Sequence, residues 1–320
     1  MSDRSASDGR DASCDGLVPR TGQTRAGVPL SLNRAPAEDL APWVARMVAA
    51  KIEASESNRI ACGMLNDVPY VRSLIGGSWT AQTAGGLQRC QQQALLFGPQ
   101  SKLMAVNCTG EIYTAGFGLR PGALYALAGI KGGEILDQIM PCDRIGLAQT
   151  DFAGLFSPDD DPEVWLCALE NALRQHIAMT DAREPDPIST HFHLAAFADP
   201  NLSVHHYAED RDIGMKRLER IVKRDFGLTP KQVLRRARAL DMASQLCGVA
   251  DSDEESELLL RYSDQSHQIR EFMAFFGLTP SQFRMQAKPL LTLNLEARQA
   301  QRLEELDRID PGGPRPWRKD

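Results

Sequence analysis

The chain has 320 residues and a formal net charge of −6, with 42% hydrophobic and 24% charged residues. This length has room for two domains, and the acidic balance argues against a general polyanion binder. The seven cysteines include no CxxC pair and no Cys/His ligand spacing, so the sequence indicates neither a disulfide framework nor a zinc site. We expect reduced thiols, a cytoplasmic location, no metal and no cofactor.

Residues 1–30 are expected to be a disordered leader. They are rich in Ser, Asp, Arg and Gly and lack the apolar core of a signal peptide. No run approaches the roughly eighteen apolar residues that cross a membrane, so we expect no membrane partner.

Residues 31–180 are predicted to form a β-rich N-terminal domain, because short apolar or alternating runs are separated there by Gly, Asn and Pro. A helix is expected near Pro42–Lys51 and another at Ala123–Leu127, ending at Gly129. A third helix is expected at Asp159–Met179. The predicted strands are Ile60–Met64, Val71–Leu74, Ala94–Phe97, Leu103–Asn107 and Tyr113–Leu119.

Residues 181–189, with Pro185 and Pro187, are the best candidate for a linker to a C-terminal domain at 190–305. His191 and His193 would face the same way on a strand, but no third ligand accompanies them. Residues 306–320 are rich in Pro, Gly and Arg and are predicted to form a flexible tail.

A helix with one buried and one cationic face is predicted between Gly214, its N-cap, and Gly227, its end. A short helix over Val204–Glu209, capped by Ser203, precedes it, and this order is helix-turn-helix organisation. Residues 211–240 contain ten Lys or Arg and three Asp or Glu, a local charge of +7. The expected buried face consists of Leu218, Ile221, Val222 and Phe226. The cationic face consists of Lys216, Arg217, Arg220, Lys223 and Arg224.

The seven residues of Phe226–Gln232 return fifty residues later as Phe276–Gln282, with six of the seven identical. A repeat at a fixed offset indicates that one small unit occurs twice. Gln232–Cys247 is expected to be a long helix that acts as a rigid spacer. The second recognition helix is expected to run through Phe275, with Ser263 or Asp264 as its cap. Its predicted apolar face consists of Ile269, Phe272, Met273 and Phe276, with Ser266, His267 and Arg270 opposite.

From about Ser203 to Arg284 the chain resembles the DNA-binding domain of the AraC/XylS transcriptional regulators. The resemblance implies two helix-turn-helix units joined by a long helix, with recognition helices in the major groove about one turn apart. It is carried by Met215–Arg220 (MKRLER), Phe226–Lys231 (FGLTPK), Tyr262–His267 (YSDQSH), Ile269–Phe272 (IREF) and Phe275–Arg284 (FFGLTPSQFR).

More loosely, Gly118–Ala123 (GLRPGA) together with Leu136–Gln138 (LDQ) resembles the sensor-type N-terminal domains of some of these regulators. The expected fold class is therefore α+β. A β-rich, barrel-like sensor or regulatory domain precedes an all-α double helix-turn-helix domain.

Arg217 and Arg220 are the expected base readers, because Arg pairs bidentately with guanine. Lys223 and Arg224 lie further along the helix and are expected to hold phosphate. The alternative for this face is a plain solvated surface. In the second helix the resemblance places Gln265, Ser266, His267 and Arg270 at recognition positions; a structural hydrogen bond is the alternative for His267.

The chain departs from the family pattern in the second unit more than in the first. Asp212 and Arg261 stand where the family usually has Gly, and Ser256 and Glu257 where it has small apolar residues. Asp251–Glu257 holds five carboxylates and no base. We therefore expect the second unit to bind DNA weakly or to dock differently.

These observations predict a non-enzymatic, sequence-specific regulator of transcription that reads two adjacent major-groove segments. The expected partner is double-stranded DNA. RNA polymerase, a small-molecule effector and a second copy of the chain are further candidate partners. The alternative is a protein-interaction adaptor with a degenerate second unit. A rarer third class would add a Cys-dependent enzyme, but Asp67, Asp137 and Asp143 are isolated carboxylates and the sequence shows no nucleophile motif.

Overall fold

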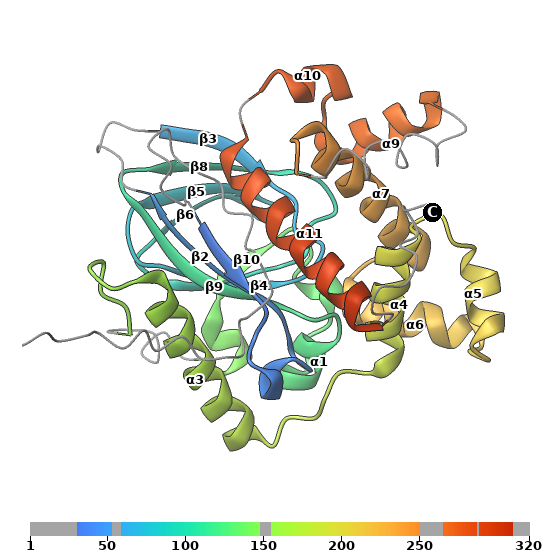
Figure 1. Cartoon of the computed structure of the whole chain (residues 1–320), viewed down its shortest axis with the longest axis horizontal. Helices are drawn as coiled ribbons and strands as arrows, with labels where there is room; N and C mark the ends of the chain where they lie inside the picture. The colour runs from blue at the N-terminus through green and yellow to red at the C-terminus, as the bar shows by residue number, and fades with distance from the viewer. Residues whose placement is uncertain (1–30, 53–58, 148–154, 250–264, 287, 310–320) are drawn as a thin grey trace, which may run out of the picture.

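The computed structural model describes residues 31–52, 59–147, 155–249, 265–286 and 288–309 (Figure 1). The expected leader, the acidic run Asp251–Glu257, Arg261 and the chain beyond residue 309 lie outside the described residues. In the described part, strands make up most of the N-terminal half and helices form the C-terminal half. This confirms the predicted α+β fold class.

Two antiparallel sheets pack face to face in the N-terminal half. The larger has the strand order β1-β2-β9-β4-β7-β10, and the smaller has the order β3-β8-β5-β6. No strand pairing among the described residues joins the two sheets, so they form an open sandwich instead of a closed barrel. The larger sheet consists of β1 (Ser31–Arg34), β2 (Val44–Ile52), β4 (Tyr70–Leu74), β7 (Ala94–Phe97), β9 (Ile112–Leu119) and β10 (Ile139–Pro141). The smaller consists of β3 (Arg59–Met64), β5 (Ser78–Thr83), β6 (Gly86–Gln91) and β8 (Met104–Thr109).

Strand burial follows from the layers. Along β8 buried residues alternate with more exposed ones, because one face of the smaller sheet is open. All residues of β4, β7 and β9 are buried. Their second face is covered by α3 (Pro162–Thr180), whose Trp165, Leu166 and Leu169 join the core of the larger sheet. The sandwich half therefore has three layers, one helix and two sheets.

The five predicted strands are confirmed to within two residues at each end, as is the helix now seen as α1 (Ala123–Ala128). The helix expected at Asp159–Met179 is confirmed as α3, which begins three residues later than expected. The helix expected at Pro42–Lys51 is wrong, because Val44–Ile52 is β2. Its alanines favour a helix locally, but β2 pairs with β1 on one side and β9 on the other, and this position decides the conformation. The strands β1, β5, β6 and β10 were not predicted.

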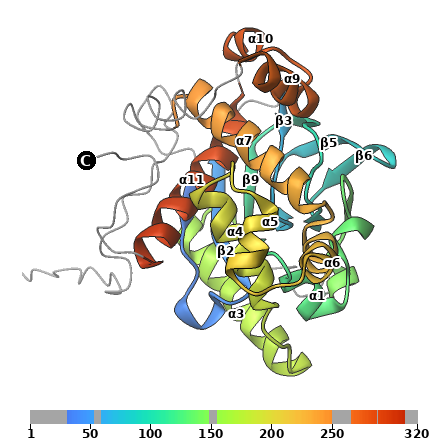
Figure 2. The same ribbon diagram turned by 90° about the vertical axis from the view of Figure 1, so that its right-hand side faces the viewer.

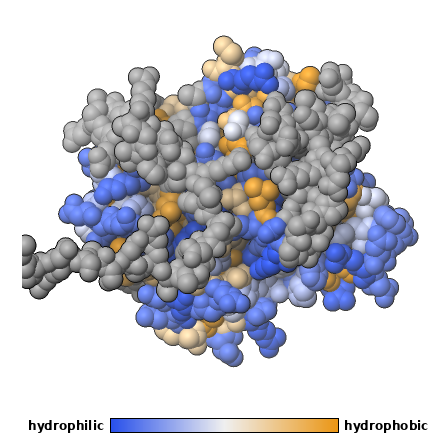
Figure 3. Space-filling view, in the orientation of Figure 1, coloured by the Kyte–Doolittle hydropathy of each residue, from blue (hydrophilic) through white to orange (hydrophobic). Residues whose placement is uncertain are grey.

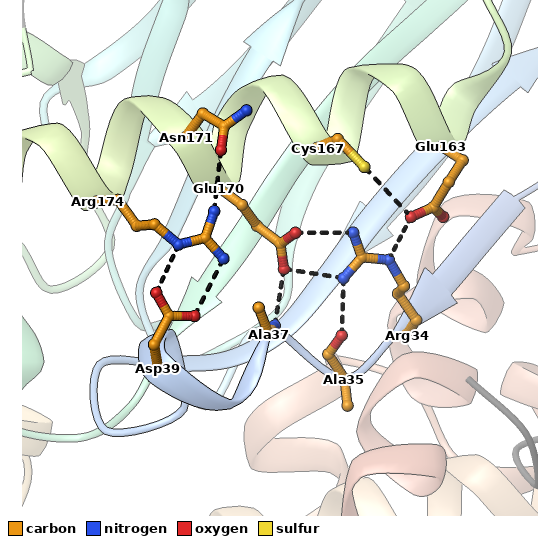
Figure 4. Close-up of polar contacts among 9 residues, drawn as sticks. All are labelled: Arg34, Ala35, Ala37, Asp39, Glu163, Cys167, Glu170, Asn171 and Arg174. Carbon is orange, nitrogen blue, oxygen red and sulfur yellow. Dashed lines mark hydrogen bonds and ion pairs between the residues drawn. The ribbon is translucent and has the colours of Figure 1, made fainter. Parts of the chain in front are cut away.

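Polar contacts fasten α3 to the chain between β1 and β2 (Figure 4). The guanidinium of Arg34 donates to both oxygens of buried Glu170, at 2.9 and 3.0 Å, and to Glu163 at 2.7 Å. Glu170 also accepts from the backbone N–H of Ala37 at 2.8 Å. A two-oxygen Arg–carboxylate pair is strong and directional, so it fixes where α3 lies on the sheet.

The C-terminal half is helical from Pro187, where Asp186 caps the first helix. Residues 187–189 of the expected linker are thus helical. His191 and His193 lie on this helix and not on a strand, so they do not share a face as they would on a strand. The helices are α4 (Pro187–Ala198), α5 (Val204–Asp210), α6 (Met215–Phe226), α7 (Pro230–Leu246), α9 (Gln265–Phe276), α10 (Pro280–Arg284) and α11 (Pro289–Ile309).

The helix α11 was not predicted, and it joins the two halves. It crosses from β1, β2 and β3 to α7 and α4 (Figures 1 and 2). Leu290 packs into the sandwich core, and Leu295 packs into the core around α7 and α9. Arg298 donates to Asp67 of the sandwich half at 2.9 Å and to Asp241 of α7 at 2.7 Å. Residues 306–309, expected to begin the flexible tail, are the last turn of this helix.

Candidate nucleic-acid interface

The first helix-turn-helix unit consists of α5, a four-residue turn and α6. Ser203 caps α5, with its hydroxyl accepting from the backbone of His206. In the turn, Asp212 has φ +52°, the left-handed conformation that Gly usually supplies and that Asp tolerates. The predicted unit, including its caps, is confirmed.

The helix α6 has the two faces that the sequence predicted. Leu218, Ile221, Val222 and Phe226 are at most 3% exposed and pack on α4, α5 and α7. Lys216, Arg217, Arg220 and Lys223 are exposed on the other side. Figure 3 shows hydrophilic colouring over the rim formed by α5 and α6. A cationic helix face that projects from a helix-turn-helix unit can enter the major groove.

Arg224 differs from the other four cations of α6. It donates to Asp225 at 2.5 and 2.7 Å and lies 3.6 Å from a carboxylate oxygen of Asp186. Its guanidinium also lies 4.4 Å from the ring centroid of Tyr125, on α1 of the sandwich half. The hydrogen bond that Arg224 donates to Asp225 raises the pKa of Arg224. Arg224 therefore faces the sandwich half, and Lys216, Arg217, Arg220 and Lys223 form the exposed cationic face of α6.

The second unit is described only in part. Gln265, Ser266 and His267 lie in the first turn of α9, and their side chains are outside the described residues. Arg270 is exposed one turn further along. The predicted apolar face is partly wrong, since Ile269 and Met273 are each 41% exposed. The other two members of that face, Phe272 and Phe276, are buried as predicted, and Phe275 is buried with them, packed with Phe283. The ring centroids of Phe272 and Phe276 lie 5.1 and 5.0 Å from that of Phe283.

The sequence repeat is also a structural repeat. Gly227 and Gly277 both have positive φ, at +70° and +68°, and each ends a recognition helix. Thr229 and Thr279 each cap the following helix through a capping box, with Gln three residues later. Each recognition helix therefore leads into its successor through the same short turn.

The long helix α7 separates the two recognition helices. In Figure 2, α6 lies at the lower end of α7 and α9 lies further up beside it. Glu271 of α9 accepts from Arg235 at 2.9 Å and from Arg238 at 3.0 Å, both on α7. These ion pairs hold α9 against the spacer, which fixes its position relative to α6.

Comparison with known families agrees with this geometry. Residues 207–286 match the family model described as "Helix-turn-helix domain". These residues form a helix-turn-helix domain of the AraC type. The AraC-type domain includes both recognition helices and the spacer between them.

Solved structures show more distant likeness. ToxT from Vibrio cholerae is 7% identical, with 74% of this chain and 97% of that chain covered and a TM-score of 0.44. An unsaturated fatty acid bound ToxT from Vibrio cholerae is also 7% identical, with 81% and 99% covered and a TM-score of 0.43. The AraC-like transcriptional activator CuxR is 11% identical, with 80% and 91% covered and a TM-score of 0.28. Likeness at this level supports no inference about function. No curated protein matches the chain.

Other kinds of site find little support among the described residues. Burial raises the pKa of the Cys90 thiol to about 11 and that of Cys108 to about 12, whereas a catalytic thiol needs a lowered pKa. No group of three or more His, Cys, Asp or Glu in the described chain is placed to hold a metal ion. None of the described helices is long and apolar enough to span a membrane.

Proposed function

We propose that the chain is a sequence-specific regulator of transcription that reads two adjacent major-groove segments through α6 and α9. The exposed cationic face of α6, on a correctly capped helix-turn-helix unit, is the observation that carries this proposal. The helices from Pro187 onward are the proposed DNA-binding half, and residues 31–180 are the proposed regulatory half.

Residue roles follow from exposure and position. Arg217 and Arg220 would pair with guanine, while Lys216 and Lys223 would contact phosphate. Arg224 would stabilise the junction of the two halves and would not contact DNA, because Asp225, Asp186 and Tyr125 already contact its guanidinium. Gln265, Ser266, His267 and Arg270 would read the second segment. RNA polymerase contact and self-association stay predictions that rest on the family resemblance.

Selection from random DNA duplexes tests this proposal. The protein should enrich a motif of two blocks whose centres lie about 10–10.5 base pairs apart. Arg220→Ala should relax only the first block and Arg270→Ala only the second. Arg89→Ala, which removes an exposed cation from β6, is the matched control and should leave both blocks intact. A single enriched block would contradict two-segment recognition.

One observation favours the second candidate, a protein-interaction adaptor. Ile269 and Met273 lie four residues apart on α9 and are each 41% exposed. Residues at this spacing share one helix face. An adaptor would enrich no DNA motif in the same selection, so the experiment separates the two functions.

A further inference from the structure

A cavity lies between the two sheets, directly beneath α11. Its volume is about 40 Å³. A single water needs roughly 10–15 Å³ by this measure, so the cavity has room for a group of a few heavy atoms. Arg72 and Trp79 line it from the sheets, Ile112 from β9, and Leu290 and Asn294 from α11.

Arg72 is buried in this cavity without a partner. It is 6% exposed, and no described residue forms a hydrogen bond or ion pair with it. Its guanidinium carbon lies 5.6–5.7 Å from the ring centroids of Tyr70, Trp79 and Phe97. By contrast Arg46, Arg120 and Arg298 are equally buried, and each pairs with a carboxylate. Arg236 lacks a carboxylate too, but it donates to the backbone carbonyls of Gln100 and Asp67. Among the buried arginines of the described chain, Arg72 thus differs in having neither a hydrogen bond nor an ion pair.

The nearest ionisable groups do not neutralise this charge. Tyr70 and Cys108 face Arg72, and burial raises the pKa of each to about 12. Both are therefore uncharged at neutral pH. Burial also lowers the pKa of Arg72. An isolated buried cation is costly unless something pairs with it.

A second unpaired donor lines the same cavity. Trp79 is 1% exposed, and its Nε1 has no hydrogen-bond partner among the residues that the structure describes. Arg and Trp side chains donate hydrogen bonds and accept none. Both residues line the cavity, so an occupant that satisfied both donors would have to be an acceptor.

We infer that this cavity binds an organic carboxylate, with its head accepting from Arg72 and Trp79 and its apolar part against Ile112 and Leu290. The planar guanidinium matches a carboxylate because two parallel N–H···O bonds form. The apolar lining favours an organic anion over an inorganic one. A hydrocarbon group packs against apolar side chains, whereas phosphate would lose its hydration there without replacement.

The place of the cavity connects it to the AraC-type domain. Leu290, Leu293 and Asn294, which cover it, belong to α11. The same helix contacts α7 through Arg298 and Asp241. An occupant that moves α11 would therefore change how the helical half sits on the sandwich. The role of the carboxylate as an effector rests on the proposed function, whereas its binding does not.

Thermal unfolding and calorimetric titration of the full chain without DNA test the binding. The probes are acetate, butyrate and benzoate, with butyramide and inorganic phosphate as controls. We expect at least one carboxylate to raise the Tm saturably with one site per chain, and to change the fluorescence of wild-type protein but less that of Trp79→Phe. Butyramide and phosphate should do neither. An equal response to phosphate would overturn the assignment to carboxylates, and no response to any of the three carboxylates would overturn the site.

Two buried arginines provide matched variants. Arg72→Met should weaken carboxylate binding at least about tenfold, because a charged hydrogen bond is lost. Without carboxylate this variant should be at least as stable as the wild type, since an unpaired buried cation has been removed. Arg46→Met should instead be destabilised, because it leaves Glu304 and Asn33 without their partner. A variant Arg72→Met that loses stability as Arg46→Met does would show that Arg72 is structural.

The effector role is tested separately, by DNA titration with and without the binding carboxylate. We expect the carboxylate to change DNA affinity in the wild type and not in Arg72→Met. Unchanged affinity would remove the effector role and leave the binding site standing. Failure of the chain to bind DNA would remove the proposed function, and the thermal result would be unaffected.

Discussion

The backbones of Gly132 and Gly227 touch across the junction of the two halves. A Cβ built on Gly132 would lie 2.5 Å from the backbone nitrogen of Gly227, and one on Gly227 would lie 2.8 Å from the carbonyl of Gly132. Gly227 ends α6, and Gly132 belongs to the short 3-10 helix η3 (Gly132–Glu134) of the sandwich half. The sandwich therefore rests directly on the end of the first recognition helix, beside Arg224 and Tyr125.

This contact predicts unequal effects at the two repeated glycines. Gly227→Ala and Gly277→Ala should each lose about 1–2 kcal/mol, because both positions are left-handed. Gly277 has no described atom within 4 Å of an added Cβ. Gly227→Ala should therefore lose roughly 1–3 kcal/mol more, from crowding against Gly132. Urea unfolding of both variants measures the difference. Equal losses of stability would mean that the backbone around Gly132 moves aside for the added methyl group at no cost in free energy.

Arg298 should be the most sensitive ion-pairing residue of α11. It is 5% exposed and pairs with Asp67 and with Asp241, which is 1% exposed. Arg298→Met leaves these carboxylates without their closest cation, and we expect a loss of about 3–5 kcal/mol. Arg308→Met is the control on the same helix. Its side chain is 62% exposed and pairs with Glu305, so about 0–1 kcal/mol should be lost. Thermal unfolding that ranks the two variants alike would contradict the role of α11 as a fastener.

Stability should fall as pH drops from about 6.5 to 4 because of His193. Burial lowers the pKa of His193 from 6.5 to about 4, opposed by Asp67 and assisted by Arg120, Arg298 and Arg236. In this window the unfolded chain binds a proton that the folded chain does not, so acid favours unfolding. His193→Phe should flatten the pH profile of stability between these values. Phe197→Leu, a packing change at the neighbouring ring, should lower stability about equally at every pH.

Two cations of α6 should act on DNA in distinguishable ways. Arg220→Ala should weaken binding to the selected site by about 1–3 kcal/mol and relax its sequence preference. Lys223→Ala should weaken binding to all duplexes alike and reduce the salt slope by about one. Titrations of selected and scrambled duplexes at two salt concentrations measure both effects. If Arg220→Ala left the ratio of the two affinities unchanged, the base-reading face would lie elsewhere.

The helix-turn-helix units could be predicted from sequence because their signals are local. Gly227 and Thr229 fix the end of one helix and the start of the next through backbone conformation and capping, within a few residues. The face of α9 was less predictable. Helical spacing defines a stripe, but the ring of Phe283 decides which side of the stripe is buried, and this placed Phe275 inside and Ile269 outside.

The remaining failures concern partners distant in sequence. The strand β2 depends on β1 and β9, and its own residues favour a helix. In α11 the buried positions include Arg298, Arg302 and Glu305, so the helix lacks a clear apolar stripe. Arg72 lies in the strand sequence Tyr-Val-Arg-Ser-Leu, and nothing in that sequence indicates that its side chain is buried. Only the assembled fold shows that no carboxylate in the described part of the chain pairs with it.

The order in which the chain is made gives α11 one more consequence. Every other described element leaves the ribosome before it, including both sheets and both recognition helices. Until residues 289–309 emerge, α11 does not cover the cavity, and Asp67 does not have its ion pair with Arg298. The sandwich is thus completed by a helix synthesised well after it, through contacts that span more than two hundred residues. Such late, long-range closure is slow compared with local folding, so a ribosome that stalls before residue 289 would leave the earlier helices without the contacts that α11 makes to the sandwich.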